Sequence, residues 1–133
     1  MTLYINTTDF HNLELAIINM GEVSTFQKNL DFNENFKTLE LIEKFLKKQK
    51  VSPKKLEQIL VCSGPGSFTG IRVGVALSQG LGLALSIPVQ AIPKSKLPKD
   101  LSKLSEIKLS QKFTLHYGAK PRITKAKKKT RSL

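Results

Sequence analysis

The chain has 133 residues, of which 40% are apolar, so we expect one modest domain and no second full hydrophobic core. The formal net charge of +12 is unevenly distributed: residues 1–93 carry nine Lys and Arg against eight Asp and Glu, while residues 94–133 carry thirteen against two. This distribution predicts a nearly neutral domain, residues 1–93, followed by a basic carboxy-terminal segment, residues 94–133. The single cysteine, Cys62, excludes an internal disulfide framework, and with neither a leader sequence nor a stretch of about 18 apolar residues we expect a cytoplasmic protein that does not bind membranes.

Three strands are predicted in the first thirty residues, over 2–8, 13–19 and 22–30, where β-branched and other apolar residues are frequent. Gly21 separates the second strand from the third, and its tolerance of positive φ suits a tight hairpin. The three strands are therefore expected to form an antiparallel meander.

The first helix is predicted over residues 36–49, where apolar residues follow the helical period. Its apolar arc exceeds half of the circumference, whereas an ordinary surface helix needs only about 100°. We therefore expect this helix to be covered on two sides. A turn at Ser52 and Pro53 leads to a buried strand at 56–64.

The second helix is predicted over residues 69–86, before Pro88, and a short strand follows at 89–92. Small residues recur every four positions on two of its flanks, which are Gly70, Gly74, Ser78 and Gly82 on one and Ala76, Gly80 and Ala84 on the other. Because glycine within a helix costs roughly 0.5–1 kcal/mol relative to alanine, these positions need a compensating gain. We expect one flank to pack against the sheet or the first helix and the other to receive a second chain.

The sequence GPGSFTG, residues 64–70, lies where glycine-rich loops often bind phosphates. It lacks the Lys of a Walker A loop, and Pro65 removes one backbone donor. Ser67, Thr69 and Arg72 are still candidates for an anion site at the start of the helix, where Arg72 is expected to face a carboxylate or a phosphate. The alternative, which we favour, is a tight strand-to-helix turn, so no cofactor is predicted.

No catalytic or metal-binding constellation is evident in the sequence. His11 and His116 have no cysteine or carboxylate at ligand spacing, and Ser63 and Ser67 have no identifiable base. We therefore predict that the protein is not itself an enzyme.

The segment CSGPGSFTGIRVGVALSQGLGLALSIPVQAI, residues 62–92, resembles the signature of the TsaB (YeaZ) family. These are bacterial proteins needed to make N6-threonylcarbamoyladenosine at position 37 of tRNAs that read codons beginning with A. The resemblance covers about residues 1–93, and HYGAKPRITK at 116–125 is similar to the family's carboxy-terminal segment. It implies an α/β fold, namely a single actin-like ATPase (ribonuclease H-like) subdomain with three antiparallel strands extended by parallel strands through helical crossovers.

The resemblance also implies a non-catalytic subunit that pairs with its larger catalytic paralogue, TsaD, through the two helices. It would work alongside the ATPase TsaE and the enzyme TsaC, and a homodimer through the same helices is an alternative. The residues predicted at the partner interface are Leu41, Phe45, Ile71, Gly74, Val75, Ala76, Ser78, Gly80 and Leu83. The two flanks of the second helix cannot be told apart at this stage, because both are apolar.

Three departures from the family pattern bear on function. Asn6 stands where the family usually has Asp, so a metal or phosphate role for the first strand loses its carboxylate. The family's histidine near the start of the first helix is not evident. The usual second domain is expected to be replaced by the basic residues 94–133, which we expect to contact tRNA only non-specifically.

A second function class stays open beside the first. The protein would then be a small RNA-binding module in which the basic tail does the main work. Phe113 and Tyr117 are the candidate stacking residues of that tail.

Overall fold

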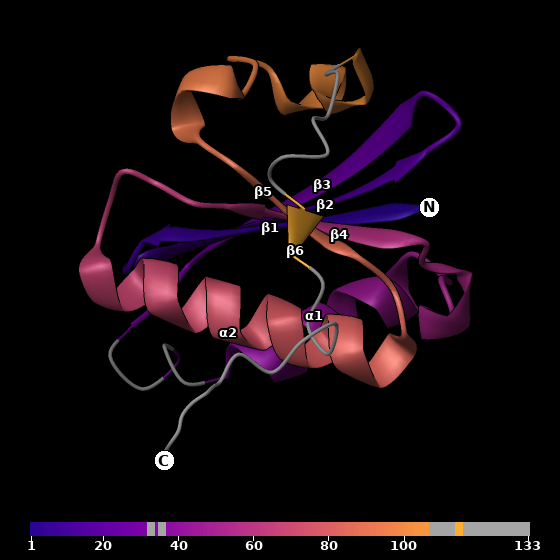
Figure 1. Ribbon diagram of the computed structural model, residues 1–133, viewed down its shortest axis with the longest axis horizontal. Helices are drawn as coiled ribbons and strands as arrows, with labels where there is room; N and C mark the ends of the chain where they lie inside the picture. Colours follow the sequence, from indigo (N-terminus) through magenta and orange to yellow (C-terminus); the bar gives the residue numbers. More distant parts are fainter. Residues whose placement is uncertain (32–33, 35–36, 107–113, 116–133) are drawn as a thin grey trace, which may run out of the picture.

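The computed structural model describes residues 1–31, 34, 37–106 and 114–115. One sheet with the strand order β3-β2-β1-β4-β5-β6 forms its centre. Helices α1 and α2 lie on one face of this sheet, and the two short 3₁₀ helices that follow β5 lie on the other (Figure 1). The expected α/β fold, in which three antiparallel strands are extended by parallel strands through helical crossovers, is confirmed.

The first three strands form the predicted antiparallel meander. They are β1 (Thr2–Asp9), β2 (Asn12–Asn19) and β3 (Glu22–Asn29). Gly21 closes the second hairpin with a φ of +84°, a conformation that residues with a side chain rarely adopt.

Two helical crossovers extend the meander with parallel strands. Helix α1 (Thr38–Lys48) leads to β4 (Gln58–Cys62), which pairs in parallel with β1. Helix α2 (Phe68–Leu85) leads to β5 (Val89–Ile92), which pairs in parallel with β4. Both crossovers place their helix on the same face of the sheet. The short β6 (Thr114–Leu115) pairs antiparallel with β5.

The larger core lies between the sheet and the two helices. Phe45 of α1 is 3% exposed and packs against Phe26 of β3, with their ring centroids 5.6 Å apart. Alternate residues of the strands supply the rest of this core, among them Leu3, Ile5, Leu13, Leu15, Ile59 and Val61. This alternation follows from the two-residue period of a strand, which sends neighbouring side chains to opposite faces.

The opposite face of the sheet has a smaller core that two 3₁₀ segments help to frame. These are η3 (Lys94–Lys96) and η4 (Leu101–Glu106), which follow β5, whereas η2 (Pro53–Lys55) precedes β4 on the side of α1. Leu104 is 2% exposed and joins Tyr4 in this core. The start of the segment expected to be a basic tail thus packs on the domain, whereas residues 107–113 and 116–133 lie outside the described part.

The sequence predicts no stretch long and apolar enough to span a membrane, but helix α2 meets that criterion. With 18 residues and a mean hydropathy of 1.3, it is long and apolar enough to cross a membrane by length and composition alone. The residues of α2 that are buried, Gly70, Gly74, Ser78 and Gly82, all lie on the flank that packs against the sheet. In this structure α2 is therefore a helix of the folded domain.

Candidate functional site

The glycine-rich loop is a tight turn that joins β4 to α2. The backbone N–H of Ser67 donates to the carbonyl oxygen of Thr8 at 2.6 Å, and the Ser67 hydroxyl accepts from the N–H of Gly70 at 3.0 Å. A Cβ on Gly66 would lie 2.5 Å from the same Thr8 oxygen. Two donors that an anion would need are thus used within the domain, which favours the turn interpretation.

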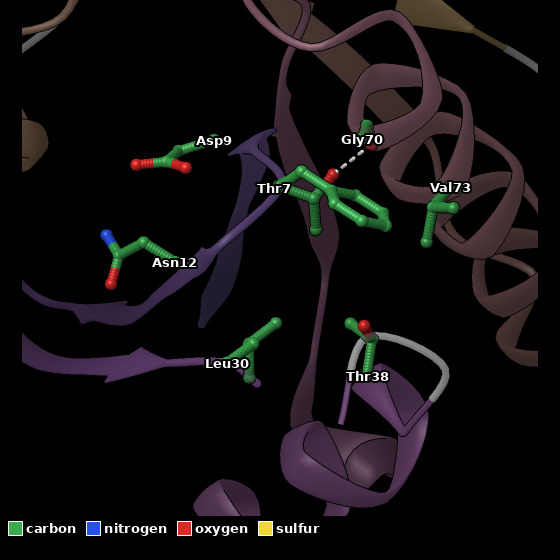
Figure 2. Close-up of a pocket in the computed structure, with 8 residues that line it drawn as sticks. Thr7, Asp9, Asn12, Leu30, Thr38, Gly70 and Val73 are labelled. Carbon is green, nitrogen blue, oxygen red and sulfur yellow. Dashed lines mark hydrogen bonds between the residues drawn. The ribbon is translucent and has the colours of Figure 1, made fainter. Parts of the chain in front are cut away.

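One flank of α2 packs on the sheet with almost no space between backbones. The Thr7 hydroxyl donates to the carbonyl oxygen of Gly70 at 2.5 Å (Figure 2). A Cβ on Gly74 would lie 3.4 Å from the Cβ of Thr7 and closer still to its Oγ1. At the other end, a Cβ on Gly82 would lie 2.5 Å from Cγ2 of Val89. This flank therefore faces the domain's own sheet.

The other flank of α2 is open. A Cβ on Gly80 would meet no atom within 4 Å, and Ala76 and Ala84 are exposed. Leu83 is 53% exposed and Phe68 is 70% exposed. Single exposed apolar side chains are ordinary, whereas a contiguous exposed apolar patch indicates contact with a partner. The question of which flank is free, open at the level of sequence, is thus settled.

The residues expected at the partner interface divide between surface and interior. Three of them are buried within the domain and are not available to a partner in this structure, namely Phe45, Gly74 and Ser78. Phe45 is covered by β3, and the other two lie on the sheet-facing flank. Of the remaining expected residues, Leu41, Ile71 and Val75 are half-buried, and Ala76, Gly80 and Leu83 are exposed.

Arg72 differs from its expected role. Its guanidinium lies over the ring of Phe68, 4.3 Å from the centroid. Among the residues that the structure describes, no carboxylate is within ion-pair distance of Arg72. Thr69 is exposed beside it. Phe68 was not among the predicted site residues, and its position as an aromatic residue in the first turn of an apolar helix was the available signal.

A small pocket lies where β1 ends, between the beginnings of α1 and α2 (Figure 2). Thr7 and Val73 line one side, and Leu30 and Thr38 line the other. The one carboxylate of the lining, Asp9, accepts the backbone N–H of His11 at 2.9 Å and so caps the β1–β2 turn. Among the described residues, no group of three or more His, Cys, Asp or Glu side chains that could hold a metal ion lies here.

Asn6 belongs to a polar cluster on the sheet. Its amide nitrogen donates to Glu14 at 3.2 Å, and its oxygen accepts from the backbone and hydroxyl of Thr8 at 2.9 and 2.7 Å. Glu14 also accepts from Tyr4 at 3.2 Å and from Gln27 at 2.6 Å. Aspartate at position 6 would place a second carboxylate beside Glu14 and remove one of its donors. Asn6 therefore fits this cluster better than a carboxylate would.

Two buried acids on the second face of the sheet have raised pKa values. Burial, and after it the nearby charge of Glu14, raises the pKa of the Tyr4 phenol well above its usual range. Burial also raises the pKa of the Cys62 thiol, and this outweighs the opposing effects of the Gly64 backbone and Lys94. A buried thiol with a raised pKa is a poor nucleophile, so Cys62 acts here as a core residue.

Comparison with known proteins gives one consistent result. The model of the family described as "TsaD: tRNA N6-adenosine threonylcarbamoyltransferase" matches residues 34–96. The chain is 31% identical over 85 residues to the tRNA threonylcarbamoyladenosine biosynthesis protein TsaB of Buchnera aphidicola subsp. Schizaphis graminum, which covers 64% of this chain and 40% of that protein. It is 30% identical over 96 residues to the TsaB protein of Bacillus subtilis, covering 69% of this chain and 41% of that protein.

Solved structures agree on the fold. YeaZ from Pseudomonas aeruginosa superposes with a TM-score of 0.65 and 24% identity over 72% of this chain and 46% of that chain. The chain thus spans about 40% of the length of the curated relatives it matches. These comparisons confirm the resemblance to the TsaB (YeaZ) family over about two thirds of this chain.

Proposed function

We propose that this chain, which resembles the amino-terminal part of the TsaB (YeaZ) family, is a non-catalytic subunit that supports the synthesis of N6-threonylcarbamoyladenosine in tRNA. The names of its relatives support a place in this biosynthesis. The match to the TsaD family model supports a TsaD-like protein as the partner. A TsaE-like ATPase is a further proposed partner, in the cytoplasm.

The open flank of α2 is the observation that carries this proposal. It is apolar apart from the exposed Thr69 and Arg72 in its first turns, and it faces away from the sheet. Small side chains at Ala76 and Gly80 allow a second backbone to approach closely, while Leu83 and Phe68 offer area for burial. A helix of the partner fits such a surface. The alternative of an RNA-binding module rests on Phe113 and Tyr117, which lie outside the described residues.

Co-purification of the full chain with the TsaD-like protein of the same organism tests the proposal. Leu83→Glu places a charge on the open flank and is expected to abolish the complex while the chain stays folded. Met20→Glu is the matched control, because Met20 is 96% exposed at a hairpin tip away from α2. The control should co-purify as the unchanged chain does.

Two results would contradict the proposal. One is the absence of a complex between the unchanged chain and the TsaD-like protein, and the other is a complex that Leu83→Glu does not weaken. Light scattering on the chain alone would show whether the same flank also forms a homodimer, because Leu83→Glu would then convert a dimer to a monomer.

A further inference from the structure

Residues 1–93 are nearly neutral overall, but their cationic and acidic residues lie in different segments. Six of their nine cationic residues lie within residues 44–55, a segment without Asp or Glu. Seven of their eight acidic residues lie before this segment. The six cationic residues, here called the lysine cluster, are Lys44, Lys47, Lys48, Lys50, Lys54 and Lys55.

A rigid backbone holds the lysine cluster together. Helix α1 ends with a bond from the N–H of Val51 to the carbonyl oxygen of Leu46 at 2.9 Å, and Lys50 adopts a φ of +59°. The Ser52 hydroxyl then caps η2, and Leu56, 4% exposed, anchors the end of the segment in the core. The last turn of α1 and the whole of η2 therefore lie next to each other. Residues 44–55 precede β4, at the end of the sheet opposite the turn at 64–70 (Figure 1).

Little on the described surface neutralises this charge. All six lysines are exposed, and within the described ranges none of them forms an ion pair. Glu40 and Glu43 lie one helical turn before Lys44 and Lys47, so these two lysines have acidic neighbours. The Glu57 carboxylate forms an ion pair with the amino-terminal ammonium group of Met1, at 2.6 Å. The strongest positive potential is thus expected around Lys48, Lys54 and Lys55.

We propose that the lysine cluster binds the phosphate backbone of RNA. The identity of this RNA rests on the function proposed above, in which tRNA is the molecule that is modified. Lysine ammonium groups contact phosphates as point charges and read no sequence, so the surface is expected to guide and hold tRNA without selecting it.

The composition of the cluster favours RNA over other anionic partners. Protein interfaces are depleted of lysine at their centres and enriched in aromatic residues and arginine, and residues 44–55 contain no arginine and one aromatic residue, the buried Phe45. Membrane-binding surfaces combine lysines with exposed apolar anchors. The large exposed apolar side chains of the described residues are Met20, Leu39, Phe68 and Leu83, all outside the cluster.

The test removes charge from the cluster and compares it with an equal removal elsewhere. The triple variant Lys48→Gln, Lys54→Gln, Lys55→Gln is made in the full chain. A matched triple variant with the same net charge carries Gln at the exposed lysines Lys94, Lys99 and Lys103 on the opposite face. These lysines begin the basic segment that is expected to contact tRNA non-specifically, so this variant measures the loss that three lysines outside the cluster would cause. Binding of fluorescently labelled tRNA is measured by anisotropy across a series of salt concentrations.

The cluster variant is expected to bind tRNA more weakly and to lower the slope of log affinity against log salt by about 2 to 3, whereas the matched variant should change it by less than about 1. Replacing the same three lysines by arginine should preserve the slope, which controls for folding. Equal slopes for the two Gln variants would overturn the proposal. So would cluster-dependent binding to vesicles of phosphatidylcholine and phosphatidylserine without any cluster-dependent change on tRNA.

Co-purification with the TsaD-like protein is run on the same variants. A cluster-specific change in tRNA binding without any complex would leave the RNA surface standing and refute the partner. The reverse result would refute only the RNA surface.

Discussion

The two flanks of α2 can be distinguished by placing leucine at Gly74 or at Gly80. The positions lie six residues apart on one helix, and the chemical change is the same. At Gly74 even the first added carbon would collide with Thr7 and disturb its 2.5 Å hydrogen bond to Gly70. At Gly80 the added carbon would meet no atom within 4 Å.

The two substitutions should therefore change stability in opposite directions. For Gly74→Leu, overpacking costs about 1–3 kcal/mol and the lost hydrogen bond about 1 kcal/mol, while the better helix propensity returns somewhat less than 1 kcal/mol. The net loss of about 1–3 kcal/mol corresponds to a fall in Tm of roughly 5–20 °C for a domain of this size. Gly80→Leu should raise the free energy of unfolding by up to about 1 kcal/mol.

Urea unfolding followed by circular dichroism measures both values, and co-purification with the TsaD-like protein completes the comparison. Gly80→Leu should remain folded and lose the partner. Gly80→Ala, which adds only one carbon, serves as the control for a surface helix position. The reasoning fails if Gly74→Leu is as stable as the unchanged chain, or if both leucine variants unfold alike.

Three further predictions concern the sheet and its two faces. Asn6→Asp should lower the free energy of unfolding by about 1–3 kcal/mol at neutral pH, and less near pH 4, because protonation relieves the repulsion with Glu14; urea titrations at the two pH values measure this. Ser78→Ala should raise the free energy of unfolding by about 1 kcal/mol, since the buried Ser78 hydroxyl has no hydrogen-bond partner in the described structure; a lower value would indicate a hidden partner. Tyr4 and Cys62 have raised pKa values in the folded state, so their contribution to the free energy of unfolding is present below their usual pKa values of 10.0 and 9.0 and is lost as the pH rises above about 9. Urea unfolding at pH 7, 9 and 10.5 should show this decline in stability, and Tyr4→Phe should make the decline shallower.

Local patterns predict most of the elements but not their mutual packing. The period-two strands and the glycine hairpin at Gly21 depend on neighbours in sequence, so the meander was predictable. The small flanks of α2 were equally visible, but only the position of Thr7 on β1 shows which flank is closed. Phe45 illustrates the same limit, because the ring that covers it, Phe26, comes from a strand far away in sequence.

Composition alone does not predict that a mostly polar segment packs on the domain through a few buried apolar residues. Residues 94–106 have the Lys, Ser and Pro content of a solvated tail, yet Leu104 is buried on the second face of the sheet. Asn6 shows a related effect at the candidate site. The family pattern marks it as a lost carboxylate, whereas its hydrogen bonds to Glu14 and Thr8 come from the pairing of β1 with β2.

The position of β1 between β2 and β4 constrains the order in which the chain can fold. Its pairing with β2 joins residues as close as Asp9 and Asn12, whereas its pairing with β4 joins residues as distant as Thr2 and Gln58. During synthesis the meander can therefore form early, while the second edge of β1 stays unpaired until β4 has left the ribosome. An unpaired apolar edge invites association with other chains. Slow translation between residues 30 and 58 would lengthen this exposed interval, so the yield of soluble protein should depend on the speed of synthesis there.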